Sequence, residues 1–150
     1  MRRKLWRSLK SAAAVGWPRL AAMAVLIFTV AAADVPPPEA GVAAATAWLR
    51  LVDHRDYAQS WQDASSFFRS EITEDHWEDR IAEVRTPLGP LLSRNLAITE
   101  PATSLPGSPD GHYLVLQYQS SFTQKKVAIE TIVLMLDQDG HYRTAGYFIR

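Results

Sequence analysis

Residues 113–149, YLVLQYQSSFTQKKVAIETIVLMLDQDGHYRTAGYFI, carry the clearest structural pattern in this chain. Apolar residues recur there at every second position, which is the period of a β-strand that packs one face against a core. The pattern predicts strands over 113–122, 127–136 and 142–149. The polar segment 123–126 forms the first bend, and Asp139-Gly140, the pair favoured in type I′ turns, forms the second hairpin.

The two faces of these strands differ, which orients the predicted sheet. The apolar face of the first strand consists of Leu114, Leu116, Tyr118 and Phe122. Its other face carries Gln117, Gln119 and Ser121. The strand over 127–136 is apolar on both faces, so we expect it to occupy a central position in the sheet.

A further strand is predicted before these three, beginning at Leu91. The residues that alternate on one of its faces are Leu92, Arg94, Leu96 and Ile98. The segment 100–111 (EPATSLPGSPDG) contains three prolines and therefore predicts a turn-rich loop after this strand.

The first half of the domain has the helical period of about 3.6 residues. Three helix faces are predicted: Val42, Ala45, Trp48, Leu49 and Val52, then Tyr57, Trp61, Ala64 and Phe68, then Trp77, Ile81 and Val84. Asp56 and Thr73 are the expected N-caps of the second and third helices, and the segment 87–90 (PLGP) ends the third. This order predicts an α+β fold, with three helices packed on a curved four-stranded antiparallel sheet.

The first 33 residues have the pattern of a secretory signal peptide. Six basic residues precede Leu20–Ala33, an unbroken apolar run that ends in three alanines. We expect cleavage after Ala33 and a periplasmic or secreted location. This run of 14 residues is shorter than the roughly 20 that span a bilayer, although an uncleaved anchor stays open as the alternative. The Pro-rich residues 34–41 (DVPPPEAG) predict an extended linker before a single domain over 42–150.

The charge of the remaining chain limits its partners. Six of the 16 basic residues and none of the 16 acidic residues lie in 1–33, so 34–150 carries 10 basic and 16 acidic side chains, a net charge of −6. This charge argues against binding to nucleic acid and, after cleavage, to anionic membranes. The chain has no cysteine, and its four histidines lack metal-binding spacing. We therefore expect no disulfide, no metal and no cofactor.

Two charged residues fall on predicted apolar faces. Arg94 alternates with leucine and isoleucine in the strand that begins at Leu91, and Glu130 alternates with isoleucine and leucine in the strand over 127–136. Charged side chains are almost never buried unless they are paired. Two interpretations stay open: Arg94 and Glu130 form structural ion pairs with each other or with nearby helix residues, or they line a ligand-binding pocket together with Tyr118. A bulge near Ser93 would instead turn Arg94 outward.

Four longer stretches resemble a known family. They are AWLRLVDHRDYAQSW (47–61), HWEDRIAEVRTPLGPLLSR (76–94), LPGSPDGHYLVLQY (105–118) and ETIVLMLDQDGHYRTAGYFIR (130–150). Together they are similar to small exported bacterial proteins catalogued as domain of unknown function 4019. The resemblance covers nearly all of 43–150 and implies no established activity, substrate or catalytic residue. The order of helices and strands is also similar to the cone-shaped fold of nuclear transport factor 2 and ketosteroid isomerase.

The polar segment 53–57 (DHRDY) contains a second set of candidate residues. The cone-shaped fold often places an acid and a tyrosine at its mouth, and by that analogy Asp53 and Tyr57 are ligand-binding candidates. The alternative is structural: Asp56 caps a helix, while Asp53 and Arg55 are solvated.

Three functions are compatible with these patterns. The leading hypothesis is a non-catalytic module that binds a small molecule or a partner protein, because no catalytic constellation is assembled in the sequence. The second is an isomerase- or dehydratase-like enzyme with Asp53 or Glu130 as its base. The third is a homodimeric assembly module formed through the face of the sheet.

Overall fold

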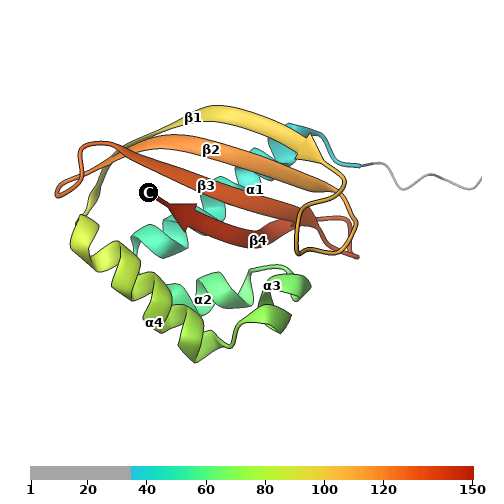
Figure 1. Cartoon of the computed structure of the whole chain (residues 1–150), viewed down its shortest axis with the longest axis horizontal. Coiled ribbons are helices and arrows are strands. Elements are labelled where there is room, and N and C mark those ends of the chain that lie inside the picture. The colour runs from blue at the N-terminus through green and yellow to red at the C-terminus, as the bar shows by residue number, and fades with distance from the viewer. Residues whose placement is uncertain (1–34) are drawn as a thin grey trace, which may run out of the picture. The chain divides into compact units, whose positions relative to one another are not determined.

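The computed structural model describes residues 35–150, and the signal peptide predicted over 1–33 lies outside this part of the chain. The described elements are α1 (Pro38–Asp53), α2 (Tyr57–Gln62), α3 (Ser66–Glu71), α4 (Glu74–Arg85), the 3₁₀ turn η1 (Thr86–Leu88), β1 (Leu91–Ala102), β2 (Tyr113–Phe122), β3 (Ala128–Leu136) and β4 (Tyr142–Ile149). The strands form one antiparallel sheet in the order β1-β2-β3-β4 (Figure 1). The α+β prediction is confirmed, and no helix within 35–150 is long and apolar enough to cross a membrane.

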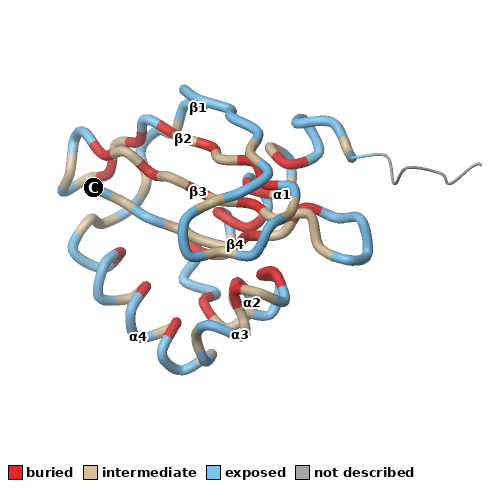
Figure 2. Tube along the Cα trace, turned by 45° about the vertical axis from the view of Figure 1, so that its right-hand side comes forward, coloured by how far each residue is buried: buried red, intermediate tan, exposed pale blue. Residues whose placement is uncertain are grey.

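The core lies between the inner face of the sheet and the helices. Figure 1 shows α1 passing behind the sheet, while α2, α3 and α4 gather beside the β4 edge. Trp48 and Leu49 of α1 pack with Leu116 and Ile132 of the two central strands. Buried positions recur along β2 and β3 (Figure 2), as their period of two predicts. β3 lies between β2 and β4, so its predicted central position is confirmed.

The first helix begins earlier than predicted. α1 starts at Pro38, so residues 38–41 are helical and the predicted linker is shorter than 34–41. Proline suits the first helical position because its missing N–H would have no partner there. Gly41 is buried, and a Cβ at this position would overlap with Leu114 Cδ2. The start of α1 is therefore part of the core.

The second predicted helix is two short helices. α2 ends at Gln62, and Ser65 starts α3 by accepting a hydrogen bond of 3.1 Å from Phe68 N. Ser65 N in turn donates to Thr144 O on β4 at 2.9 Å. The expected core positions Ala64 and Phe68 are buried all the same. The break allows the chain between α2 and α3 to bond to the edge of the sheet.

The third predicted helix, α4, is confirmed except for its last core position. Thr73 caps it as expected, accepting a hydrogen bond of 3.5 Å from His76 N. Trp77 and Ile81 are buried, but Val84 is 43% exposed. Arg85 lies in the core instead, because it follows Trp77 and Ile81 at regular steps of four residues.

Two bulges make β1 less regular than its sequence predicts. The pairing with β2 shifts between Leu91 and Ser93 and again between Leu96 and Ile98. Each bulge adds a residue and moves the following side chains to the opposite face. Ile98 consequently pairs with Gln117 on the outer face, and Leu92, Leu96 and Ile98 are all exposed. The prediction of one shared face with Arg94 is therefore wrong for Leu92 and Ile98, whereas Leu96 pairs with Tyr118 and keeps that face, although it is exposed.

The β1 strand also continues through Glu100 and Pro101 to Ala102, where the sequence predicted loop. A proline is tolerated there because β1 is an edge strand, in which one side of the backbone needs no ladder hydrogen bonds.

The hairpin at Asp139-Gly140 is confirmed, but its turn type is not I′. Gly140 N donates to Asp137 O at 2.9 Å, and Gly140 has a φ of 79°. Arg55 is the only non-glycine residue with a positive φ in the described part of the chain, so Asp139 lacks the conformation that a type I′ turn requires. The connection is a three-residue loop closed by a left-handed glycine.

Candidate functional site

Arg94 and Glu130, the first candidate residues, are in direct contact. Arg94 Nε donates to Glu130 Oε2 at 2.6 Å, and Arg94 Nη2 donates to Oε1 at 3.0 Å. The β1 bulge at Leu92 does not turn Arg94 outward, because Arg94 lies opposite Ser120 of β2, and Ser120 is buried on the inner face of the sheet. The Glu130 side chain has no exposed surface. The ion pair is present as the structural interpretation predicted, whereas a ligand-binding role for these residues stays a prediction.

Asp53 and Arg85 complete this contact as a four-membered ion cluster (Asp53, Arg85, Arg94 and Glu130). Arg94 holds Asp53 with bonds of 2.7 and 2.9 Å, and Arg85 Nη2 reaches Asp53 Oδ1 at 2.6 Å. Arg85 Nη1 also donates to Glu130 Oε1 at 3.0 Å. The structural alternative predicted that Asp53 is solvated, and this prediction is wrong. Two carboxylates face two guanidinium groups, so the charges balance within the cluster.

Glu130 has its hydrogen-bonding capacity filled. Besides the two arginines, Ser120 Oγ donates to Oε2, and the Tyr147 hydroxyl donates to Oε1 at 2.7 Å. Burial and then the charge of Glu130 raise the pKa of Tyr147, so this hydroxyl keeps its proton. Five donors on two carboxylate oxygens leave no free lone-pair direction for a substrate or water.

The two acids of the ion cluster are held in their ionised form. Burial by itself raises the pKa of Glu130, but the hydrogen bond and charge of Arg94 outweigh it, and the pKa lies below its usual value. The same balance lowers the pKa of Asp53. A catalytic base works best with a pKa near the operating pH, which for a carboxyl means a raised one. The cluster is therefore suited to joining α1, α4, β1 and β3 rather than to accepting protons.

The other candidate residues lie around this cluster. Tyr118 is buried on β2 and lies opposite Glu130 of the neighbouring strand β3. Tyr57 is buried at the start of α2 and lines a pocket of about 100 Å³ with Asp53 and Arg85. Asp56 occupies the N-cap position of α2, but its side chain makes no capping hydrogen bond.

Sequence reasoning missed Arg85 and Tyr147, although weak signals existed. Arg85 continues the four-residue spacing of the apolar face of α4. Tyr147 lies opposite Ile132, an inner-face residue of β3, but a bulge in the pairing before this point reverses the simple alternation of β4.

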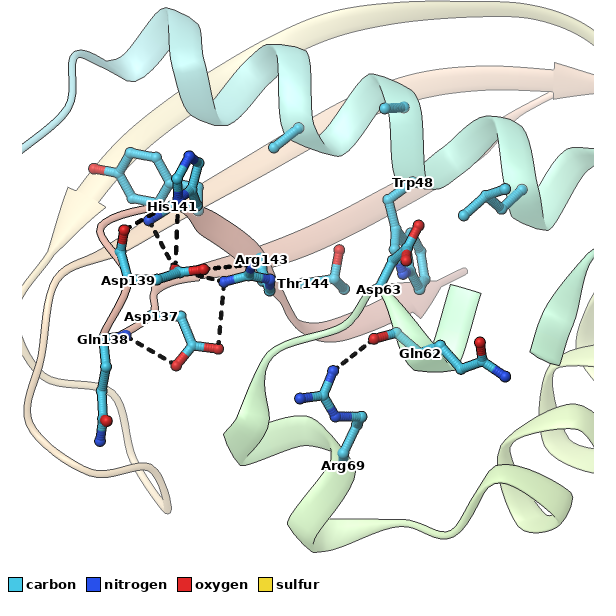
Figure 3. Close-up of a pocket in the computed structure, with 14 residues that line it drawn as sticks. Trp48, Gln62, Asp63, Arg69, Asp137, Gln138, Asp139, His141, Arg143 and Thr144 are labelled. Atoms are coloured by element: carbon cyan, nitrogen blue, oxygen red, sulfur yellow. Dashed lines mark hydrogen bonds and ion pairs between the residues drawn. The ribbon is translucent and has the colours of Figure 1, made fainter. Parts of the chain in front are cut away.

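A groove of about 770 Å³ lies away from the ion cluster. Its walls come from α1, from the end of α2 with the start of α3, and from the β3–β4 hairpin (Figure 3). The residues that line it include Ala44, Ala47, Trp48, Asp63, Arg69, His141 and Arg143. No pattern in the sequence predicted this groove, because its walls join segments far apart in the chain.

The hairpin wall of the groove is tied together by its own charges. Arg143 holds Asp139 with two hydrogen bonds of 2.6 Å, and these bonds are the main reason that the pKa of Asp139 lies well below its usual value. Asp137 accepts from Ser66 N at 3.0 Å and from Ser66 Oγ at 2.9 Å. The hairpin is thereby attached to the first turn of α3.

The wall formed by α2 and α3 holds its charges differently. Arg69 Nη1 donates to the carbonyl oxygens of Gln62 at 2.5 Å and Ala64 at 2.9 Å. Within residues 35–150, Arg69 has no carboxylate within ion-pair distance. Asp63 uses one oxygen to accept from Gln59 Nε2 at 2.8 Å. This wall thus presents a guanidinium and a carboxylate that do not neutralise each other.

Residues 35–150 contain no group of three or more His, Cys, Asp or Glu side chains that could hold a metal ion. In comparisons with known proteins, no curated protein matches the chain. A family model described as protein of unknown function (DUF4019) matches residues 44–147, which include every residue of the ion cluster and all of the sheet except the last two residues of β4. The chain therefore belongs to the DUF4019 family.

Proposed function

We propose that this domain is a non-catalytic binding module and that the groove is its binding site. The observation that carries the proposal is the groove itself, whose volume of about 770 Å³ lies within the 300–1,000 Å³ typical of small-molecule sites. Its lining combines an apolar surface on α1, at Ala44 and Ala47, with polar side chains from the two other walls. Such a combination gives a ligand both buried area and orientation.

The ion cluster supports binding over catalysis. The acids that an isomerase- or dehydratase-like enzyme would use, Asp53 and Glu130, have lowered pKa values and are bonded to arginines. Protonating either acid would break hydrogen bonds inside the core. We therefore assign the cluster a structural role and the groove the contact with ligand.

A fragment screen followed by NMR tests this proposal. Protein produced from the full sequence is labelled with ¹⁵N, and chemical-shift changes locate each bound fragment. We expect shifts at Ala47, Arg69 and His141, and their loss in Arg69→Ala. Arg80→Ala is the matched control, because Arg80 is on α4 and does not line the groove. Fragments that bind elsewhere, or no binding at all, would overturn the proposal.

A homodimer formed through the outer face of the sheet is the second candidate function. A solvated face of an antiparallel sheet is ordinarily polar, yet β3 presents Ile129 and Val133 there, and Phe148 of β4 is 63% exposed. Four strands of 8 to 12 residues cover roughly 600 Å² at ordinary strand spacing. Standard interfaces bury about 600–1,000 Å² per partner, so this face is large enough for an interface with a second copy of itself at the lower end of that range.

Sedimentation over a range of concentrations tests the dimer. We expect a dimer that Phe148→Ser dissociates and that Val35→Ser leaves intact, because Val35 is exposed before the start of α1 and does not belong to the sheet. A monomer at every concentration removes this candidate and leaves the groove proposal untouched.

We also infer that the protein is exported. Support comes from the basic start, the apolar run and the alanines before Asp34. The net charge of −6 over 34–150 fits a domain that stays free of anionic membrane surfaces after processing.

A further inference from the structure

Two groove residues of opposite charge form no ion pair with any other residue of the described part of the chain. Arg143, Asp139 and Asp137 are occupied with one another and with α3. Arg69 and Asp63 remain, and neither forms an ion pair within residues 35–150. The groove therefore offers a ligand one positive and one negative group.

Hydrogen bonds attach the Arg69 side chain to the backbone on either side of Asp63. Arg69 Nη1 bonds the carbonyl oxygens of Gln62 and Ala64, which are the residues on either side of Asp63. These bonds use one of the three nitrogens of the guanidinium, so Nη2 and Nε keep their donors. Asp63 keeps one carboxylate oxygen beyond its bond to Gln59. Figure 3 shows Asp63 and Arg69 among the groove residues, with Arg69 bonded to the neighbouring Gln62.

The opposite wall supplies an apolar surface next to these charges. Ala44 and Ala47 project from α1 beside Trp48, and their small side chains leave room for a ligand. A ligand that satisfies the whole groove needs a carboxylate for Arg69, an ammonium for Asp63 and an aliphatic part for α1. Carboxylate and guanidinium form charge-assisted pairs, which are the stronger class of hydrogen bond.

We propose that the groove binds a small zwitterion with an aliphatic side chain, such as a free amino acid. This inference rests on the proposed function, because it names the ligand class of the same groove. Arg69 contacts the carboxylate of the ligand, and Asp63 contacts its ammonium group. Each charge is recognised separately, so removing either one from the ligand weakens binding.

Calorimetric titration with three probes tests the ligand class. The probes are leucine, N-acetylleucine, which lacks the ammonium, and leucinamide, which lacks the carboxylate. We expect leucine to bind at least tenfold more tightly than either analogue. Asp63→Asn should remove the preference over N-acetylleucine, and Arg69→Gln should remove the preference over leucinamide. Arg80→Gln, which lies outside the groove, should change neither ratio.

A second variant separates ligand contact from loss of folding. Ala47 is exposed on α1, so Ala47→Phe fills the groove without disturbing the core. We expect it to abolish leucine binding while the melting temperature stays within a few degrees of the wild type. Equal binding of leucine and its analogues would overturn the zwitterion assignment, as would failure of leucine to bind. If fragments still bound the groove in the NMR screen, the binding function would stand and only the ligand class would be wrong.

Discussion

Arg94 on β1 and Asp53 at the end of α1 are joined by two hydrogen bonds of 2.7 and 2.9 Å. The same guanidinium holds Glu130 on β3, and Arg85 from α4 repeats the arrangement on the other side. The ion cluster thus connects two helices to two strands through charges that are largely removed from water. Its value to the fold depends on all four members being present, because each charge is solvated by the others.

Replacing Glu130 with glutamine should strongly destabilise the protein. The substitution leaves two buried guanidinium groups with one carboxylate between them, and breaking a buried pair in this way costs about 3–5 kcal/mol. The free energy of unfolding from urea titration measures the effect. Glu83→Gln is the control, because the ion pair between Arg80 Nη1 and Glu83 Oε2 is 3.7 Å long and mostly exposed. This substitution should cost less than about 1 kcal/mol. Similar losses in the two variants would contradict a structural role for the cluster.

The stability of the domain should fall in acid. The pKa values of Asp53 and Glu130 are lowered by folding from ordinary values of 3.8 and 4.5. The unfolded chain therefore binds more protons than the folded chain once the pH drops below about 4.5, and the stabilisation is lost progressively as the pH falls through the folded-state values. It is fully present at neutral pH. Urea titrations from pH 7 to pH 3 measure this slope.

The acid slope should be smaller in Glu130→Gln, since that variant has lost one of the carboxyl groups whose pKa is lowered by folding. Glu83→Gln should keep the slope of the wild type. An identical slope in Glu130→Gln would mean that other carboxylates cause the acid sensitivity.

Arg55→Gly should stabilise the protein. Arg55 follows the C-cap of α1 with a φ of 65°, and Asp56 N closes the turn by donating to Leu51 O at 2.8 Å. A left-handed conformation costs a residue with a side chain about 1 kcal/mol, whereas glycine adopts it freely. We expect a gain of about 0.5–1 kcal/mol in the free energy of unfolding. Arg55→Ala keeps the strain and should show no such gain; equal effects of the two variants would locate the change in the arginine side chain rather than in the backbone.

The predicted signal peptide gives a direct test of export. Expression of the full sequence in a bacterial host should yield a mature chain that begins at Asp34, as read by mass spectrometry of the intact protein. Ala33→Arg should block processing, because the residue before the cleaved bond must be small. Ala32→Gln changes the tolerant middle position and should be processed normally. An unprocessed wild-type chain held in the membrane fraction would favour the uncleaved anchor.

Local patterns predicted more of this structure than its site. The alternation in 113–136 identified the inner face of β2 and β3, and with it the burial of Glu130, because the side chains of a regular strand must alternate between faces. The same rule failed on β1. Two bulges, which alternation cannot predict, move Leu92 and Ile98 away from the face of Arg94. The inward direction of Arg94 was predicted correctly only because it lies between the two bulges.

Alternation and helical spacing predict which side chains are buried. The order of residues alone therefore determined the α+β class, the four strands and the presence of a buried arginine and a buried glutamate. Partners were settled by packing. Arg94 meets Asp53 across 41 residues of chain and Arg85 meets Glu130 across 45, and the groove has walls from three separate segments. Such contacts depend on how whole helices and strands pack against one another. The periodicity within one element predicts which of its faces is buried, but it does not predict which other element packs on that face.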